Sequence, residues 1–290
     1  VSMMEFLHIC KDADFKNVAC SIKASNTRIM VQATRLLSQR MIEEDCRFPI
    51  HLGVTEAGAG EDGRIKSAVG SGSLLLDGIG DTIRVSLTEA PECEIPVCKL
   101  IVDYRNEVFV TPLYFEPIED VRKAIDAYSL YQTTAVSGIG GDSVPMVFGS
   151  ENTKTDWVWM GNFIQKDAVK IPVVSLQAYN KSERCVLQIS ETELDTLKTM
   201  ELGSNTIILF DCKDIHVTYL TRKLYAMLAG RKNPVVLARS YDYADFATLQ
   251  IRAAMDFGSL LLDGFLNGVM IRTSHFSENQ LVDLSFAILQ

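Results

Sequence analysis

The amino-acid sequence predicts an α/β protein built in two parts. Short apolar segments alternate with helical segments over the first hundred residues, and the same alternation resumes from about residue 143. Strands that are connected through helices pair in parallel by right-handed crossovers. A length of 290 residues agrees with two parts, since one domain takes roughly 150 residues. We expect the domains to be residues 1–105 and residues 106–290.

Each element of the first part has a local reason. The strand candidates are short and apolar, as buried parallel strands are. Helices are expected where apolar residues recur at intervals of three and four, and glycine after Asp77 ends one of them. The expected strands are residues 15–22, 48–54 and 82–87, and the expected helices are residues 5–10, 27–41, 65–76 and 91–102.

The second part shows the same two kinds of segment with looser spacing. Trp157 and Trp159 stand two residues apart, so they would share one face of a strand and pack there. The expected strands are residues 108–114, 143–148, 171–176, 185–189, 205–210, 234–238 and 268–271. The expected helices are residues 119–128, 191–200, 217–228, 244–262 and 277–289.

An internal repeat connects the two parts. The motif GSLLLDG occupies residues 72–78 and again residues 258–264, an offset of 186 residues, and a strand and a helix follow both copies. We interpret the repeat as a duplication. Beyond the motif the copies differ, because Met270 aligns with Arg84 and Arg272 aligns with Ser86.

Charge and hydropathy exclude several classes of protein. A net charge of −9 does not suit a nucleic-acid partner, because there is no basic field to displace phosphate counterions. The longest apolar run is far below the ~20 residues that cross a bilayer, and no signal peptide is visible. We therefore expect a cytoplasmic protein with neither a nucleic-acid nor a membrane partner.

The seven cysteines predict reduced, mostly buried thiols. Their number is odd, and no pair has the C-x-x-C spacing. Cys93 and Cys98 are the nearest pair, but no histidine stands close enough to complete a metal site. We expect no metal site in this chain.

Polar residues at three strand ends predict an anion site. Lys23 ends the first strand, Glu56 follows the second, and Arg84 and Ser86 share one face of the third. Lysine and arginine donate charge-assisted hydrogen bonds to oxyanions. The glycine-rich residues 58–63 allow backbone amides to approach a phosphate.

The helix after this loop is expected to add to the same site. Lys66 and Ser67 are expected to begin it, where the helix dipole favours anions. Glu56 would serve as an acid, a base or a hydroxyl acceptor.

Several of these residues could instead have a purely structural role. A single lysine after a strand, such as Lys23, is usually a solvated loop residue, and Glu56 could cap a helix. Arg84 within an apolar strand needs a partner. His51 fits a hydrogen-bonded core histidine better than a catalyst, and residues 138–141 fit a turn, because no lysine follows their glycines.

Four motifs together resemble the 4-hydroxy-3-methylbut-2-enyl diphosphate synthase family. They are SIKASN at residues 21–26, HLGVTEAG at 51–58, KSAVG at 66–70 and DGIGDTIRVSL at 77–87. The resemblance is specific over residues 5–102 and weaker over residues 103–290. It implies the C-terminal part of a TIM-like β/α barrel, followed by a degenerate barrel-like β/α insert domain of the large, plant-like form, for which we expect a structural role.

The resemblance also implies a function. The family reductively opens and dehydroxylates 2-C-methyl-D-erythritol 2,4-cyclodiphosphate with electrons from a 4Fe-4S cluster. Ferredoxin or flavodoxin supplies these electrons to the cluster. Lys23, Arg84 and Ser86 would bind phosphate oxygens, and Glu56 would face the reacting hydroxyl. Asn26 stands where many members carry aspartate, so we expect it to bind substrate without transferring a proton.

The sequence departs from the family in its cysteines. The family's Cys-Pro-x-Cys cluster segment has no counterpart here, so we expect a fragment that by itself binds no cluster and turns over no substrate. Two alternatives stay open. One is another phosphate-binding β/α enzyme in which Lys23 forms a Schiff base, and the other is a purely structural domain fragment.

Overall fold

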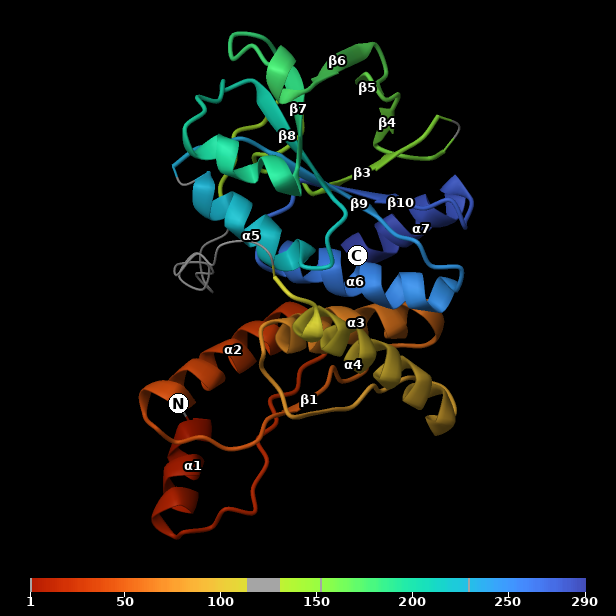
Figure 1. Cartoon of the computed structure of the whole chain (residues 1–290). Coiled ribbons are helices and arrows are strands. Elements are labelled where there is room, and N and C mark those ends of the chain that lie inside the picture. The colour runs from red at the N-terminus through yellow and green to blue at the C-terminus, as the bar shows by residue number, and fades with distance from the viewer. Residues whose placement is uncertain (1, 114–130, 152, 229) are drawn as a thin grey trace. The chain divides into compact units, whose positions relative to one another are not determined.

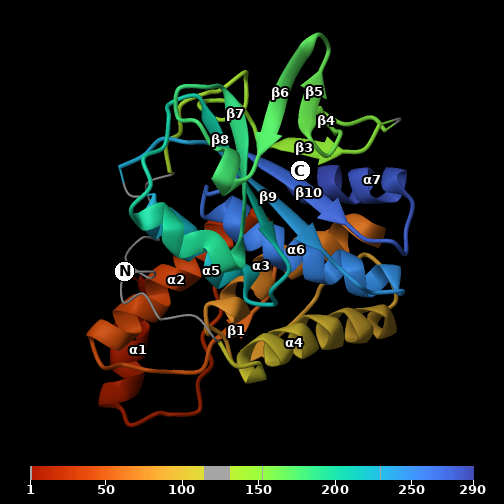
Figure 2. The same cartoon turned by 45° about the horizontal axis from the view of Figure 1, so that its top comes forward.

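The computed structural model describes residues 2–113, 131–151, 153–228 and 230–290 (Figures 1 and 2). The chain divides into two compact units. The first consists of Val1–Pro112 and Gln250–Ser259, and the second consists of Leu113–Leu249 and Leu260–Gln290.

The first unit contains an incomplete parallel β/α arrangement. A bridge joins Cys20 to Ile50, and β1 pairs in parallel with β2. Helices α2 and α3 pack against each other, as do α3 and α4. The elements are α1 (Ser2–Asp12), α2 (Thr27–Glu43), β1 (His51–Leu52), α3 (Gly60–Leu76), β2 (Thr82–Ile83), the 3₁₀ helix η1 (Pro91–Cys93) and α4 (Glu94–Val110).

The described residues of the second unit form a closed barrel in the order β10-β3-β4-β5-β6-β7-β8-β9. Its pairs are parallel except for β4–β5 and β5–β6, which are antiparallel. Its strands are β3 (Met146–Gly149), β4 (Trp157–Trp159), β5 (Phe163–Lys166), β6 (Val169–Val174), β7 (Cys185–Ser190), β8 (Thr206–Cys212), β9 (Val235–Ser240) and β10 (Gly268–Arg272). Its other elements are η2 (Leu176–Ala178), η3 (Glu191–Lys198), α5 (Val217–Met227), α6 (Phe246–Leu262) and α7 (Glu278–Leu289).

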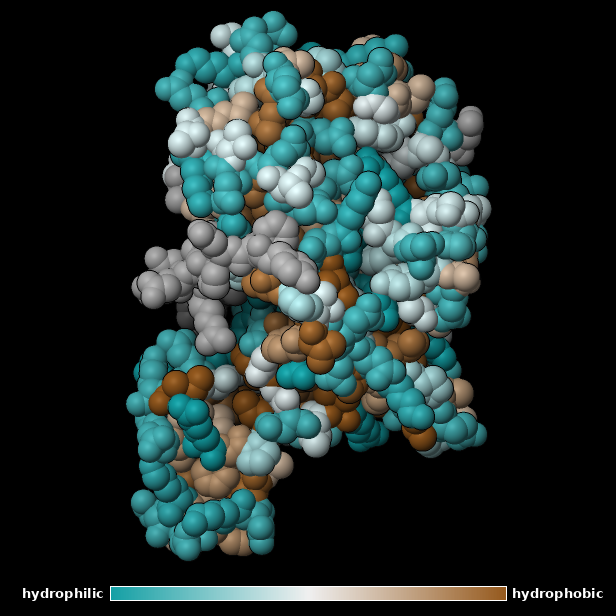
Figure 3. All heavy atoms as spheres, viewed as in Figure 1, coloured by the Kyte–Doolittle hydropathy of each residue, from teal (hydrophilic) through white to brown (hydrophobic). Residues whose placement is uncertain are grey.

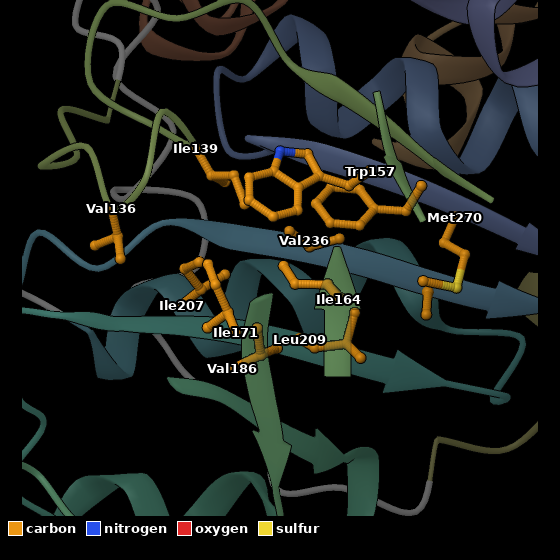
Figure 4. Packing of buried hydrophobic residues seen from close by; sticks show 12 residues of the cluster. Val136, Ile139, Trp157, Ile164, Ile171, Val186, Ile207, Leu209, Val236 and Met270 are labelled. Carbon is orange, nitrogen blue, oxygen red and sulfur yellow. The ribbon is translucent and has the colours of Figure 1, made fainter. Parts of the chain in front are cut away.

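The barrel interior is apolar, and Figure 4 shows its side chains pointing toward one another. Trp157 is the largest member of this cluster and is 1% exposed. Met270, which the sequence repeat aligns with Arg84, is also part of it. Burial of these side chains stabilises the barrel by roughly 1.5–3 kcal/mol for each large residue.

The surface of the first unit is partly hydrophobic, as the brown spheres in Figure 3 show. Five of the exposed large apolar side chains lie on α1 and α2, namely Phe6, Ile9, Ile29, Leu36 and Ile42. None of the helices in the described part of the chain combines the length and hydropathy that a membrane span needs.

Most of the expected elements are confirmed within a few residues, and four expectations need comment. Residues 108–113 are not a strand, because α4 continues to Val110 and the apolar end of the helix resembles a strand. Residues 191–198 form a 3₁₀ helix and not an α-helix. Residues 15–19 form no strand, and only Cys20 pairs. The helix expected at residues 119–128 lies outside the described residues.

The internal repeat has a structural counterpart. Helices α3 and α6 have 17 residues each, and their bounds differ by the same 186 residues as the two motifs. In the first unit the equivalent serines meet, because Ser259 Oγ donates a hydrogen bond to Ser73 Oγ at 3.0 Å. Equal element length and equivalent contacts support the duplication inferred from the sequence.

Candidate functional site

One face of the sheet in the first unit is apolar and buried, and the opposite face is polar. Ile50, Leu52 and Val85 are each at most 6% exposed. The alternating side chains Lys23 and Arg84 are exposed. Because strand side chains alternate between faces, the polar residues of three neighbouring strands lie on the same side. The residues of that side are Ser21, Lys23, His51, Thr82, Arg84 and Ser86.

A glycine brings the two cations together. A Cβ atom at Gly53 would lie 2.8 Å from Lys23 Nζ and 3.0 Å from the Arg84 carbonyl oxygen. Because Gly53 has no side chain, the Lys23 ammonium can lie over the middle segment. It lies there next to the segment that carries Arg84. Burial and the Arg84 charge lower the pKa of Lys23. Two cations that repel each other on one face favour an anion between them.

His51 belongs to the same face. Its Nδ1 lies 2.8 Å from Thr82 Oγ1, on the neighbouring strand. Burial lowers the pKa of His51, and the charges of Lys23 and Arg84 lower it further. The sequence suggested a core histidine, whereas the structure shows a half-buried one beside the cations. The sequence analysis did not place His51 on this face, although its spacing of two residues from Gly53 could have indicated it.

Glu56 adopts an unusual backbone conformation. Its φ angle is +54°, in the left-handed region that is costly for residues other than glycine. Its side chain is exposed, in the loop that follows the strand end. Strained residues of this kind occur at functional sites, where the surrounding structure holds them.

Arg84 and Asn26 differ in their surroundings from what the sequence suggested. Arg84 lies on the exposed face, so solvent reaches it and burial does not demand an ion partner. Asn26 is the N-cap of α2, where its Oδ1 accepts a hydrogen bond from the Ile29 amide at 2.9 Å. This cap uses only the oxygen of the Asn26 amide group.

Lys66 and Ser67 do not begin a helix. Helix α3 starts at Gly60, so both residues lie more than one turn inside it, where backbone amides are already bonded. Ser67 is also buried, at 1% exposure. The helix-dipole reason for placing a phosphate beside them is therefore wrong, and a substrate contact by either residue stays a prediction.

The cysteines of this chain do not fit an iron–sulfur cluster. No three metal-ligating side chains gather anywhere in the part of the chain that the structure describes. Burial raises the pKa of the Cys20, Cys98 and Cys185 thiols, which disfavours the thiolate form that binds iron. All seven cysteines are free thiols, and four of them are buried.

The second unit carries a different polar group at its strand ends. Arg272 Nη1 lies 2.8 Å from Asp211 Oδ2, and Gln188 donates to the same oxygen at 2.9 Å. The Arg272 charge is therefore neutralised within the barrel. Among its described residues, the second unit does not reproduce the paired cations of the first unit.

Comparison with known proteins also distinguishes the first part of the chain from the rest. Residues 1–99 match the GcpE TIM-barrel domain, so this part of the chain has the fold of a β/α-barrel protein of this class. Beyond this domain, the chain is similar over most or all of its length to 4-hydroxy-3-methylbut-2-en-1-yl diphosphate synthases.

Two relatives show how the similarity is distributed. The flavodoxin-type synthase of Porphyromonas gingivalis is 40% identical over 100% of this chain and 50% of its own length. The ferredoxin-type synthase of Synechococcus elongatus is 58% identical over 101 residues, which are 35% of this chain and 25% of the relative. The chain thus spans about half the length of the curated relatives that it matches along its whole length.

Proposed function

We propose that the first unit binds the diphosphate of 2-C-methyl-D-erythritol 2,4-cyclodiphosphate in an oxidoreductase that converts it to 4-hydroxy-3-methylbut-2-enyl diphosphate. The observation that carries this proposal is the cationic face at Gly53, where Lys23 and Arg84 come together. Relatives named as synthases of this product, which match the chain over its length, support the choice of substrate.

Each residue of the face has a role in this proposal. Lys23 and Arg84 bind phosphate oxygens through charge-assisted hydrogen bonds, and Ser86 donates its hydroxyl from the same face. Glu56 faces the hydroxyl that leaves and donates a proton to it, since the departing oxygen must leave as water. Asn26, Lys66 and Ser67 are secondary candidates for substrate contact.

The two electrons must come from outside this chain. A 4Fe-4S cluster supplies them in this proposal, and its ligands lie in residues other than those of this chain. Flavodoxin or ferredoxin would be the electron donor, since the two kinds of relative are named as flavodoxin-type and ferredoxin-type synthases. Residues 106–290 serve as a structural domain, in agreement with the neutralised Arg272.

Turnover by the enzyme that contains this chain tests the proposal. Lys23→Ala and Arg84→Ala should each lower kcat/KM by about 100-fold or more, as expected when a charged substrate contact is lost. Lys16→Ala, on an exposed lysine of the same unit, and Asp242→Asn, in the loop after β9, should leave turnover unchanged. Equal activity of Arg84→Ala and wild type would refute the proposed site.

A Schiff-base function of Lys23 is the second candidate. The lowered pKa of Lys23 favours it, because a nucleophilic amine must be unprotonated. Borohydride reduction in the presence of a phosphorylated aldehyde, followed by mass spectrometry, would label Lys23 if this function holds. Absence of a label at saturating aldehyde would eliminate it.

A further inference from the structure

Helix α3 starts without a cap from its own sequence. Its N-cap residue is Ala59, which has no side-chain acceptor for the free amides of the first turn. The Gly60 amide instead donates a hydrogen bond to Glu89 Oε1 at 2.8 Å. Glu89 lies in the loop after β2, so a carboxylate from another strand end caps the helix.

Arg64 completes the arrangement. Its Nη1 and Nη2 donate to the two oxygens of Glu89 at 2.6 and 2.9 Å, and Nη1 also donates to the Gly60 carbonyl oxygen at 2.7 Å. Such a two-pronged pair is geometrically specific. The hydrogen bonds from Arg64 and from the Gly60 amide lower the pKa of Glu89 to about 2, so the carboxylate is charged at neutral pH.

Two further contacts fix the preceding loop. The Thr88 amide donates to the Gly58 carbonyl oxygen at 3.1 Å. A Cβ atom at Gly63 would lie 2.5 Å from the same oxygen, so glycine is needed at that position for the loop to approach the helix. At its other end, the Thr55 amide donates to the Ala24 carbonyl oxygen at 3.3 Å.

The loop held in this way is the one that carries Glu56 with its left-handed backbone. We propose that Glu89 is a positioning residue, which with Arg64 clamps residues 55–60 and thereby holds Glu56 at the substrate. This inference rests on the role of Glu56 in the proposed function. It adds two residues that have no substrate contact of their own.

The clamp should act on the rate more than on substrate binding. Lys23 and Arg84 lie outside this loop, so the diphosphate contacts persist when the loop loosens. Glu89→Ala should lower kcat by about ten- to a hundred-fold, the size expected when a reacting group is misplaced by about 1 Å, with KM changed less than about twofold. Glu89→Gln keeps an acceptor for the Gly60 amide and should recover part of kcat.

Hydrogen exchange of the wild type and its variants, read by mass spectrometry on the peptide that contains residues 55–63, tests the clamp without activity. Exchange should be faster in Glu89→Ala, intermediate in Glu89→Gln, and unchanged in Glu92→Ala, a control on the exposed glutamate of η1. Arg64→Gln should resemble Glu89→Gln, which provides a second route if Glu89→Ala does not fold.

The possible results test the clamp, the positioning role and the proposed function separately. Unchanged exchange in both Glu89→Ala and Arg64→Gln would refute the clamp. Faster exchange with an unchanged kcat would refute the positioning role. A wild-type enzyme that does not turn over the cyclic diphosphate would refute the proposed function and with it the positioning role, whereas the exchange comparison would still decide the clamp.

Discussion

An absent side chain sets the geometry of the candidate site. Gly53 leaves open the space in which the Lys23 ammonium lies beside the Arg84 backbone. The sequence identified both cations, but it did not single out the glycine between them. Its importance follows only from the register of neighbouring strands, which the backbone pairing determines.

Substitution of Gly53 tests this geometry. Gly53→Ala should weaken the binding of inorganic pyrophosphate by about tenfold, or about 1.4 kcal/mol, because the new methyl group displaces the Lys23 ammonium. Calorimetric titration measures the change. In a Lys23→Met background the same substitution should have little further effect. An equal loss in both backgrounds would show that alanine acts on something other than Lys23.

The pKa of His51 depends on its burial and on the charges of Lys23 and Arg84 on the same face. Its lowered pKa means that the unfolded chain takes up this proton at a higher pH than the folded chain does. The contribution of His51 to stability is therefore present above its ordinary pKa of about 6.5 and is lost as the pH falls toward the folded value. Arg84→Met should raise the pKa of His51, as followed by nuclear magnetic resonance of its ring proton. A pKa at or above the ordinary value in wild type would contradict this electrostatic picture.

The elements show where sequence patterns succeed and where they stop. Helix α2 was predicted well from its apolar spacing, whereas the role of Asn26 as its N-cap was not predicted. The start of α3 was placed five residues late, since its cap comes from Glu89 in another loop. Glu61 and Asp62 in its first turn were a local signal for the true start.

The two repeated helices allow a comparison of equivalent glycines. A Cβ atom at Gly258 would meet Val69 Cγ2 at 2.5 Å, whereas one at Gly72 would meet Met255 Cγ at 2.4 Å. Valine is stiff at χ1 and methionine is flexible. Gly258→Ala should cost about 1–3 kcal/mol of unfolding free energy, and Gly72→Ala should cost less, because Met255 has more rotamers than Val69 with which to make room. Urea denaturation measures both, and equal losses would show that the neighbouring side chain does not decide the cost.

At the scale of the whole molecule, the sequence predicted the α/β class and the weaker likeness of the second part to a barrel. It predicted strands near β4 and β6, but it did not predict β5 or the antiparallel pairing of β4, β5 and β6 that completes the barrel among the described residues. These strands are short and are joined by tight turns at Gly161 and Asp167, both with positive φ. Short strands carry little periodicity, so their pairing is decided by tertiary packing.

The two units differ in the charges of their polar side chains near the strand ends. The first unit gathers two cations on an exposed strand face, while the second pairs its inward arginine with an aspartate. An internal ion pair contributes little to stability by itself, but it removes the net charge that would attract an anion. This contrast is why we assign substrate binding to the first unit and a structural role to the second.

Direct binding of the cyclic diphosphate tests the central claim. Calorimetric titration of 2-C-methyl-D-erythritol 2,4-cyclodiphosphate into the 290-residue chain should give one site. Arg84→Met should weaken its affinity by about ten- to a hundred-fold, the worth of a hydrogen bond to a charged group. Arg28→Met, which changes an exposed arginine of α2, should bind as wild type does. Equal affinity of wild type and Arg84→Met would contradict the account.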